Sequence, residues 1–220
     1  MNSKYLKNII LGVLLGFHCG GSALAVPPDS PRISRTDFNK NMRKVWEDHI
    51  VYTRLYIVNT LAGLPAKGAT ANRLMANQAD IGNLLEPFYG EEAGAKLTAL
   101  LKDHINIAAE VIDGAKKGDT AKQNSASKRW YANSDAIAVF LENINPKHWP
   151  ADDMRKMLRE HLDTTSEEVT DNLKKDWDGD IAAYDKLHDQ ILKMADVLSS
   201  GITQQFPHQF KRESSHLNNL

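Results

Sequence analysis

The sequence has a single cysteine, Cys19, which lies within a segment expected to be removed from the mature protein. An exported chain without cysteine forms no disulfides, so packing alone must hold its fold. A G-x-S-x-G motif and a glycine-rich phosphate loop are missing too. Nucleophilic catalysis and nucleotide binding therefore have no recognisable motif in this chain.

The sequence also has no marked excess of positive or negative charge and no long apolar run. The chain carries 27 Lys and Arg against 28 Asp and Glu. This balance, without a basic block, argues against nucleic acid as a partner. The apolar run IILGVLLGF is far shorter than the roughly 20 residues needed to span a bilayer. The mature chain is therefore predicted to have no membrane span, whereas a small polar ligand is compatible with this composition.

The first residues predict a secretory signal peptide over residues 1–25. Lys4 and Lys7 precede the apolar run, and the small residues Ala23-Leu24-Ala25 form an A-x-A cleavage signal. We therefore expect the protein to be exported, to the periplasm or to the extracellular space.

Most of the remaining chain predicts one all-α domain, over residues 37–204. Apolar residues recur at three- and four-residue steps, which favours helix throughout. Residues 26–36 contain three prolines and predict a tether, and residues 205–220 predict a disordered tail. Short connections favour an antiparallel, up-and-down helical bundle of five or six helices. The expected helices cover about residues 37–62, 69–86, 91–118, 120–144, 151–162 and 164–200, the last opened by TTSEE, which resembles a capping box.

Several of these helices place polar side chains where an apolar stripe should be. The segment DWDGDIAAYDKLHDQIL shows the pattern most clearly, because Asp180, Tyr184 and His188 recur there every four residues. Helices of similar length that pack side by side bring their midpoints to one level. The sequence therefore predicts a polar core layer formed by His49, Asn77, His104, Asn133, Asp180, Tyr184 and His188.

The cost of burial limits what such a layer can be. An unsatisfied buried polar group costs roughly 1–3 kcal/mol, so the layer must bond to itself, hold water or bind a ligand. Three imidazoles and a carboxylate suit one divalent transition metal such as zinc, copper or iron. On this hypothesis the metal ligands are His49, His104, His188 and Asp180. The residues that would complete the site by hydrogen bonding are Asn77, Asp80, Asn133, Tyr184 and Arg54.

Other interpretations of the same residues stay open. A self-satisfied network would only fix the helix register of a non-catalytic structural or interaction module, and rotation of some helices would turn these residues toward solvent. His104 with Asp180 would suit an acid–base enzyme, since burial shifts pKa values. A buried histidine that titrates near pH 6.5 would make the bundle respond to pH. Arg54, inside an apolar run, is expected to reach solvent or to pair with a buried acid.

Other metal-site patterns match this sequence poorly, and one further histidine has a simpler explanation. An EF-hand calcium loop needs glycine at its sixth position and glutamate at its twelfth. In a loop that begins with DWDGD at Asp176, these positions hold Ile181 and Leu187, so the sequence does not predict an EF-hand. A ferritin-like di-iron centre needs two Glu-x-x-His units, and neither His49 nor His104 is preceded by such a glutamate. His161 lies on the apolar face of a short expected helix and is predicted to be a satisfied core histidine.

Four segments resemble a family of bacterial exported helical proteins. They are WEDHIVYTRLYIVNTLAGLP, ANRLMANQADIGN, EPFYGEEAGAKLTALLKDHI and DWDGDIAAYDKLHDQIL, and the likeness covers about residues 40–204. Some such sequences carry a glycosyltransferase label. That label disagrees with this chain, because sugar-nucleotide transferases have Rossmann-type folds and no strands are expected here. The resemblance implies a shared fold and transfers no catalytic residue.

Overall fold

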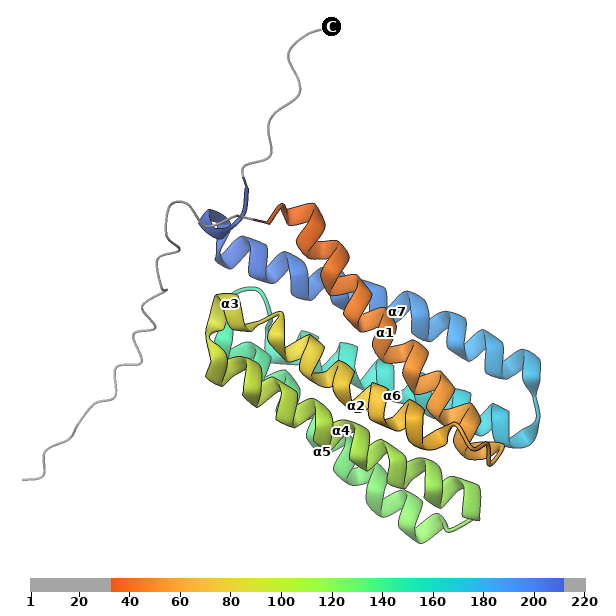
Figure 1. Cartoon of the computed structure of the whole chain (residues 1–220). Helices are drawn as coiled ribbons and strands as arrows, with labels where there is room; N and C mark the ends of the chain where they lie inside the picture. Colours follow the sequence, from red (N-terminus) through yellow and green to blue (C-terminus); the bar gives the residue numbers. More distant parts are fainter. Residues whose placement is uncertain (1–32, 212–220) are drawn as a thin grey trace, which may run out of the picture.

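A computed structural model describes residues 33–211 (Figure 1). Its long helices are α1 (Arg35–Leu61), α2 (Lys67–Asn83), α4 (Glu91–Lys117), α5 (Thr120–Ile144), α6 (Ala151–Lys174) and α7 (Trp177–Gln205). The short elements are α3 (Glu86–Tyr89) and the 3-10 helix η1 (Pro207–Gln209). These residues include no strand, which confirms the predicted all-α helical bundle, while the antiparallel up-and-down order stays a prediction. The expected signal peptide lies outside the described residues.

The long helices pack in a closed order. Each packs against the next along the chain, with α2 followed by α4, and α7 packs against α1. Every long helix therefore has an inward face, and its apolar residues form the core. Burying one large apolar side chain contributes roughly 1.5–3 kcal/mol. Inward side chains that are at most 5% exposed, one from each helix, are Met42, Ile81, Leu101, Ile137, Leu158 and Ile191.

The boundary between the last two predicted helices differs from the sequence prediction. A helix end at Leu162 and a capping box in TTSEE were expected, but α6 continues through both, so this prediction is wrong. The hydroxyls of Thr164 and Thr165 donate to carbonyl oxygens four residues earlier, which satisfies them inside a helix without capping. The helix ends instead at Lys174, and the next residue, Lys175, adopts a left-handed backbone conformation with a φ of 62°. Asp176 then caps α7 with its carboxylate.

Both ends of the folded domain extend further than predicted. Ser34 caps α1, which begins at Arg35 inside the predicted tether. At the other end Phe210 is 1% exposed and packs against Phe38 and Phe88. Figure 1 accordingly shows α3 and η1 at the same end of the bundle. Part of the predicted tether and part of the predicted tail therefore belong to the folded domain, and the other residues of both predictions lie outside the described chain.

None of the helices within residues 33–211 combines the length and the apolar composition that crossing a membrane requires.

Candidate functional site

One polar side chain from each long helix meets the others in the middle of the bundle. The ring centroid of His161 lies 5.7 Å from that of His49 and 6.5 Å from that of His104. Side-chain amides surround these three imidazoles. We call the set the polar layer; it consists of His49 (α1), Gln78 (α2), His104 (α4), Asn133 (α5), His161 (α6) and Gln190 (α7).

His104 has both ring nitrogens engaged. The indole Nε1 of Trp130, which can only donate, donates to His104 Nε2 at 2.9 Å. The proton of the neutral ring is therefore on Nδ1, which donates to Asn133 Oδ1 at 2.8 Å. The Asn133 amide nitrogen in turn donates to the Leu100 carbonyl. His104 is consequently a hydrogen-bonded core residue that offers no free lone pair.

His49 and His161 are less completely bonded. Gln78 Nε2 lies 3.3 Å from His49 Nδ1 and also donates to the Leu74 carbonyl. No hydrogen-bond partner within the described chain is found for His161 Nδ1. The same holds for three further buried atoms around these rings, namely Trp46 Nε1, Gln78 Oε1 and Gln190 Oε1. Four of the buried side-chain atoms without a partner in the described chain therefore lie around His49 and His161.

Burial keeps the imidazoles of the polar layer neutral. It lowers the pKa of His49 to about 3, assisted by repulsion from His104. It lowers the pKa of His104 to about 4, partly offset by the hydrogen bond to Asn133. The pKa of His161 is also well below its ordinary value, because of burial first and then the two other histidines.

A second buried cluster lies further along α1, α6 and α7. It contains three predicted site residues, Arg54, Asp180 and Tyr184, together with Glu168. Arg54 donates to Glu168 Oε1 at 2.7 Å and to both oxygens of Asp180 at 3.0 Å. Its guanidinium carbon lies 4.7 Å from the ring centroid of Tyr184. Arg54 thus pairs with buried acids, one of the two outcomes expected. Burial raises the pKa of Glu168 to about 7 despite the nearby Arg54.

Two predicted site residues lie outside both buried clusters. His188 is on the outer side of α7, where its Nε2 is 3.1 Å from Glu47 Oε1 and its side chain is one-third exposed. Asp80 is exposed and pairs with Arg73 at 3.0 Å. Asn77 is fully buried beside the layer, and its amide donates to the Val45 carbonyl.

The residues expected to hold a metal are therefore divided between different places. His49 and His104 both lie beside His161, whereas Asp180 belongs to the Arg54 cluster and His188 to the surface. Within residues 33–211, no group of three or more His, Cys, Asp or Glu is arranged to hold a metal ion. The polar layer also has no carboxylate, so a divalent ion there would be a buried charge without compensation. Those four residues form no common ligand set, and metal binding by the chain stays a prediction.

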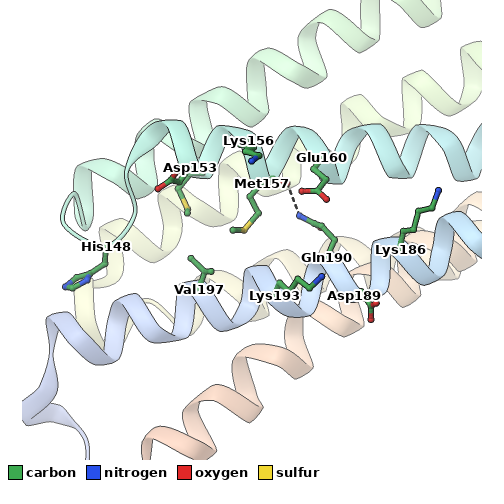
Figure 2. Close-up of a pocket in the computed structure, with 11 residues that line it drawn as sticks. His148, Asp153, Lys156, Met157, Glu160, Lys186, Asp189, Gln190, Lys193 and Val197 are labelled. Atoms are coloured by element: carbon green, nitrogen blue, oxygen red, sulfur yellow. Dashed lines mark hydrogen bonds between the residues drawn. The ribbon is translucent and has the colours of Figure 1, made fainter.

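A groove of about 600 Å³ lies between α6 and α7 (Figure 2). Met154, Met157 and Val197 supply apolar surface, and charged side chains of both signs line the rest. Gln190 belongs both to this groove and to the polar layer. It is 6% exposed, and its Nε2 donates to the Met157 carbonyl at 2.8 Å, while its Oε1 has no partner in the described chain. Gln190 therefore connects the groove to His161, but its Oε1 is buried and is not exposed in the groove.

Sequence reasoning missed the groove, Gln78, Gln190 and Glu168, and it assigned His161 only a packing role. A signal for Gln190 was present, because Ala183, Leu187, Gln190 and Met194 follow one inward stripe of α7.

Comparisons with protein-family models, with curated proteins and with solved structures found no match to this chain. The resemblance to a family of exported helical proteins accordingly stays a prediction.

Proposed function

We propose that the protein is a binding protein for a small polar molecule, and that this ligand lies in the α6–α7 groove. The observation that carries the proposal is the lining of the groove, where the apolar side chains of Met154, Met157 and Val197 lie beside charged side chains of both signs and the amide of Gln190. A ligand that has both polar and apolar groups would find partners for each on these walls.

The dimensions and lining of the groove support the same proposal. Its volume of about 600 Å³ falls within the roughly 300–1,000 Å³ typical of small-molecule sites. Such sites combine apolar walls with a few polar groups that orient the ligand, and Met154, Met157 and Gln190 supply that combination here. Export through the signal peptide expected at residues 1–25 would place this binding in the periplasm or outside the cell.

The proposal is tested by mapping amide chemical shifts on the isotope-labelled protein. Separate titrations use four small probes: glycine, acetate, ethylamine and acetamide. We expect at least one probe to shift the amides of α6 and α7 around Met157 and Gln190. Shifts that are scattered over the surface, or that are missing for all four probes, would refute the groove as a binding site.

A matched pair of variants shows whether such shifts report on the groove. Val197→Phe fills the groove with a larger apolar side chain and should abolish them. Val139→Phe makes the same change on α5, where Val139 is 38% exposed and remote from the groove, and should leave them intact. Equal effects of the two variants would contradict the assignment.

A non-catalytic structural role is the second candidate, in which the polar layer only fixes how the helices pack. The saturation of both His104 nitrogens by Trp130 and Asn133 favours this role for that side of the layer. The two candidates differ in the shift experiment, since a purely structural layer gives no saturable response at Gln190.

A further inference from the structure

We infer that an apolar surface shared by α1 and α7 binds a basic amphipathic helix of a partner protein. We call this surface the α1–α7 patch; it consists of Val51, Leu55 and Val58 on α1 and of Trp177, Ile181 and Tyr184 on α7. The patch is separate from the α6–α7 groove and does not depend on the function proposed for that groove. The exposure of these side chains, their helical spacing and the charges beside them select this kind of partner.

The patch exposes large apolar side chains to solvent. Trp177 and Ile181 are 56% and 54% exposed. Within residues 33–211 seven large apolar side chains are exposed, and four of them belong to the patch, the other two being Leu55 and Val51. Single exposed apolar residues are normal on a protein surface, whereas a contiguous group marks an interaction site. The concentration of exposed apolar residues on α1 and α7 therefore indicates a docking surface.

Two contacts align the α1 half of the patch with its α7 half. In the first contact, Glu47 Oε1 lies 3.1 Å from His188 Nε2. In the second, Arg54 donates to Asp180 Oδ2 at 3.0 Å. Later residues of α1 therefore lie beside earlier residues of α7.

The residues of the patch follow these contacts at one-turn steps. Val51 and Tyr184 each lie four residues from the first contact, toward the second. Leu55 and Ile181 directly follow the two residues of the second contact, and the remaining pair lies one turn beyond them. Residues three or four apart are neighbours on a helix surface, so the two halves form one continuous surface.

The spacing within the patch matches a helical ligand. Its residues on α1 follow the pattern i, i+4, i+7, and its residues on α7 repeat the same pattern. Seven residues of helix rise about 10 Å, and a ligand helix with apolar residues at i, i+3 or i+4 and i+7 repeats this distance. Within residues 33–211 no strand offers an edge to an extended peptide. A helix is therefore the form of ligand that fits.

Acidic residues border the patch on both helices. Glu47 precedes Val51 by one turn on α1, and Asp185 follows Ile181 by one turn on α7. Asp178 lies in the first turn of α7. All three acids are exposed, and within the described chain none of them has a Lys or Arg partner. Acids of this kind beside an apolar surface favour a partner that is basic.

The basic residues around the patch do not offset these acids. Arg54 is paired with two buried carboxylates, and Lys44 and Lys174 are each paired with an acid. Lys175, in the turn before α7, has no acidic partner in the described residues, so three acids against one base leave the border with a charge of −2. A second copy of the chain would bring the same acidic border to the contact, and an anionic membrane would also be repelled. A basic helix meets no such repulsion.

Anisotropy of a fluorescent peptide titrated with the full chain tests the inference. The probe has about 14 residues, four helical turns, and contains only leucine and lysine, with leucine along one helical face. Two control peptides accompany it: one has the same composition in an order that spreads leucine around the helix, and the other has glutamate in place of lysine. We expect each control to bind about tenfold or more weakly than the probe. No binding of the probe, or equal affinity for the probe and either control, would overturn the inference.

Matched variants show whether the probe binds to the patch. Ile181→Gln should weaken the probe about tenfold, because it removes a large apolar contact. Val139→Gln makes a comparable change at an exposed residue of α5 and should leave the affinity unchanged. Asp185→Asn should weaken the probe about threefold and reduce its dependence on salt, whereas Asp103→Asn, at an exposed acid of α4, should do neither. Equal effects within either pair of variants would contradict the site.

Two further measurements detect the other occupants. Sedimentation of the chain alone would assign the patch to a second copy if it showed a dimer that Ile181→Gln dissociates. Binding to phosphatidylglycerol vesicles that Ile181→Gln abolishes would assign it to a membrane surface. Either result would overturn the assignment to a basic helix, and we expect neither.

Discussion

The indole nitrogen of Trp130 donates to His104 Nε2 at 2.9 Å and so fixes which nitrogen of a buried histidine carries the proton. The second ring nitrogen is bound by Asn133 at 2.8 Å. A histidine that sequence analysis assigned to metal binding is thereby held by its neighbours as a neutral hydrogen-bonding group. Because both of its ring nitrogens are hydrogen-bonded, His104 has no free lone pair for a metal or another ligand.

Replacing Trp130 by phenylalanine should leave His104 Nε2 without a donor. We expect the free energy of unfolding to fall by about 1–3 kcal/mol, measured by urea denaturation. The imidazole nitrogen resonances of the wild type should show a protonated Nδ1. Trp177→Phe is the control, since Trp177 is 56% exposed and such a change is expected to stay within about 0.5 kcal/mol. Equal losses for both variants would count against the Trp130–His104 bond.

Gly201 of α7 has no room for a side chain. A Cβ there would lie 2.1 Å from Trp149 Nε1, and Trp149 is completely buried. Gly201→Ala should therefore destabilise the protein by about 1–3 kcal/mol through overpacking. Gly68→Ala, on the open side of α2 with no atom within 4 Å, should be neutral or stabilise by about 0.4–1 kcal/mol. Thermal unfolding of the two variants measures the difference, and similar melting temperatures would refute it.

Arg54 compensates two buried carboxylates, and its removal should be costly. Arg54→Met leaves Glu168 and Asp180, which are 0% and 4% exposed, without their cation. We expect a loss of about 3 kcal/mol, the lower end for a broken buried pair, because Arg54 itself is partly exposed. Arg73→Met removes two partly exposed pairs, with Asp48 and Asp80, and should cost less than about 1 kcal/mol. Chemical denaturation of both variants at neutral pH checks the contrast, which fails if Arg54→Met is as mild as its control.

Acid should destabilise the fold through its histidines. Burial holds the pKa of His49 at about 3 and that of His104 at about 4, whereas an unfolded histidine has a pKa of about 6.5. Below about pH 6.5 the unfolded chain therefore binds more protons, and stability falls as the pH drops toward these lower values. His161→Met removes one of the three imidazoles and should flatten this decline. Urea unfolding between pH 4 and 7 measures it, and an unchanged slope would argue against the mechanism.

Glu168 should act in the opposite direction. Burial raises its pKa to about 7 in the folded protein, from an ordinary value of 4.5. Between those values the folded chain binds more protons, so the stability contributed by protonated Glu168 is lost as the pH rises from 4.5 through 7. Glu168→Gln, which keeps a neutral side chain of similar shape, should remove this component. Stability curves of variant and wild type that run parallel from pH 5 to 8 would contradict the assignment.

Much of the fold was predictable because helical periodicity is local. The spacing of apolar residues predicted the helices, and the phase of each stripe placed His49 and His104 inside. The boundary within TTSEE was wrong because threonine can bond either to its own helix or to a helix start, and the sequence does not distinguish the two. That error shortened the helix around His161 and concealed its place at the middle of α6.

The sequence by itself determined that this chain forms helices and that several of them bury polar side chains. Only the tertiary structure decided which polar groups meet. Each residue of a helix turns the side-chain direction by about 100°, so two residues turn it by about 200°. Gln190 accordingly points inward, whereas His188, two residues earlier, points outward. The packing of α6 against α7 also decided where the groove lies, because a groove depends on two surfaces that are distant along the chain.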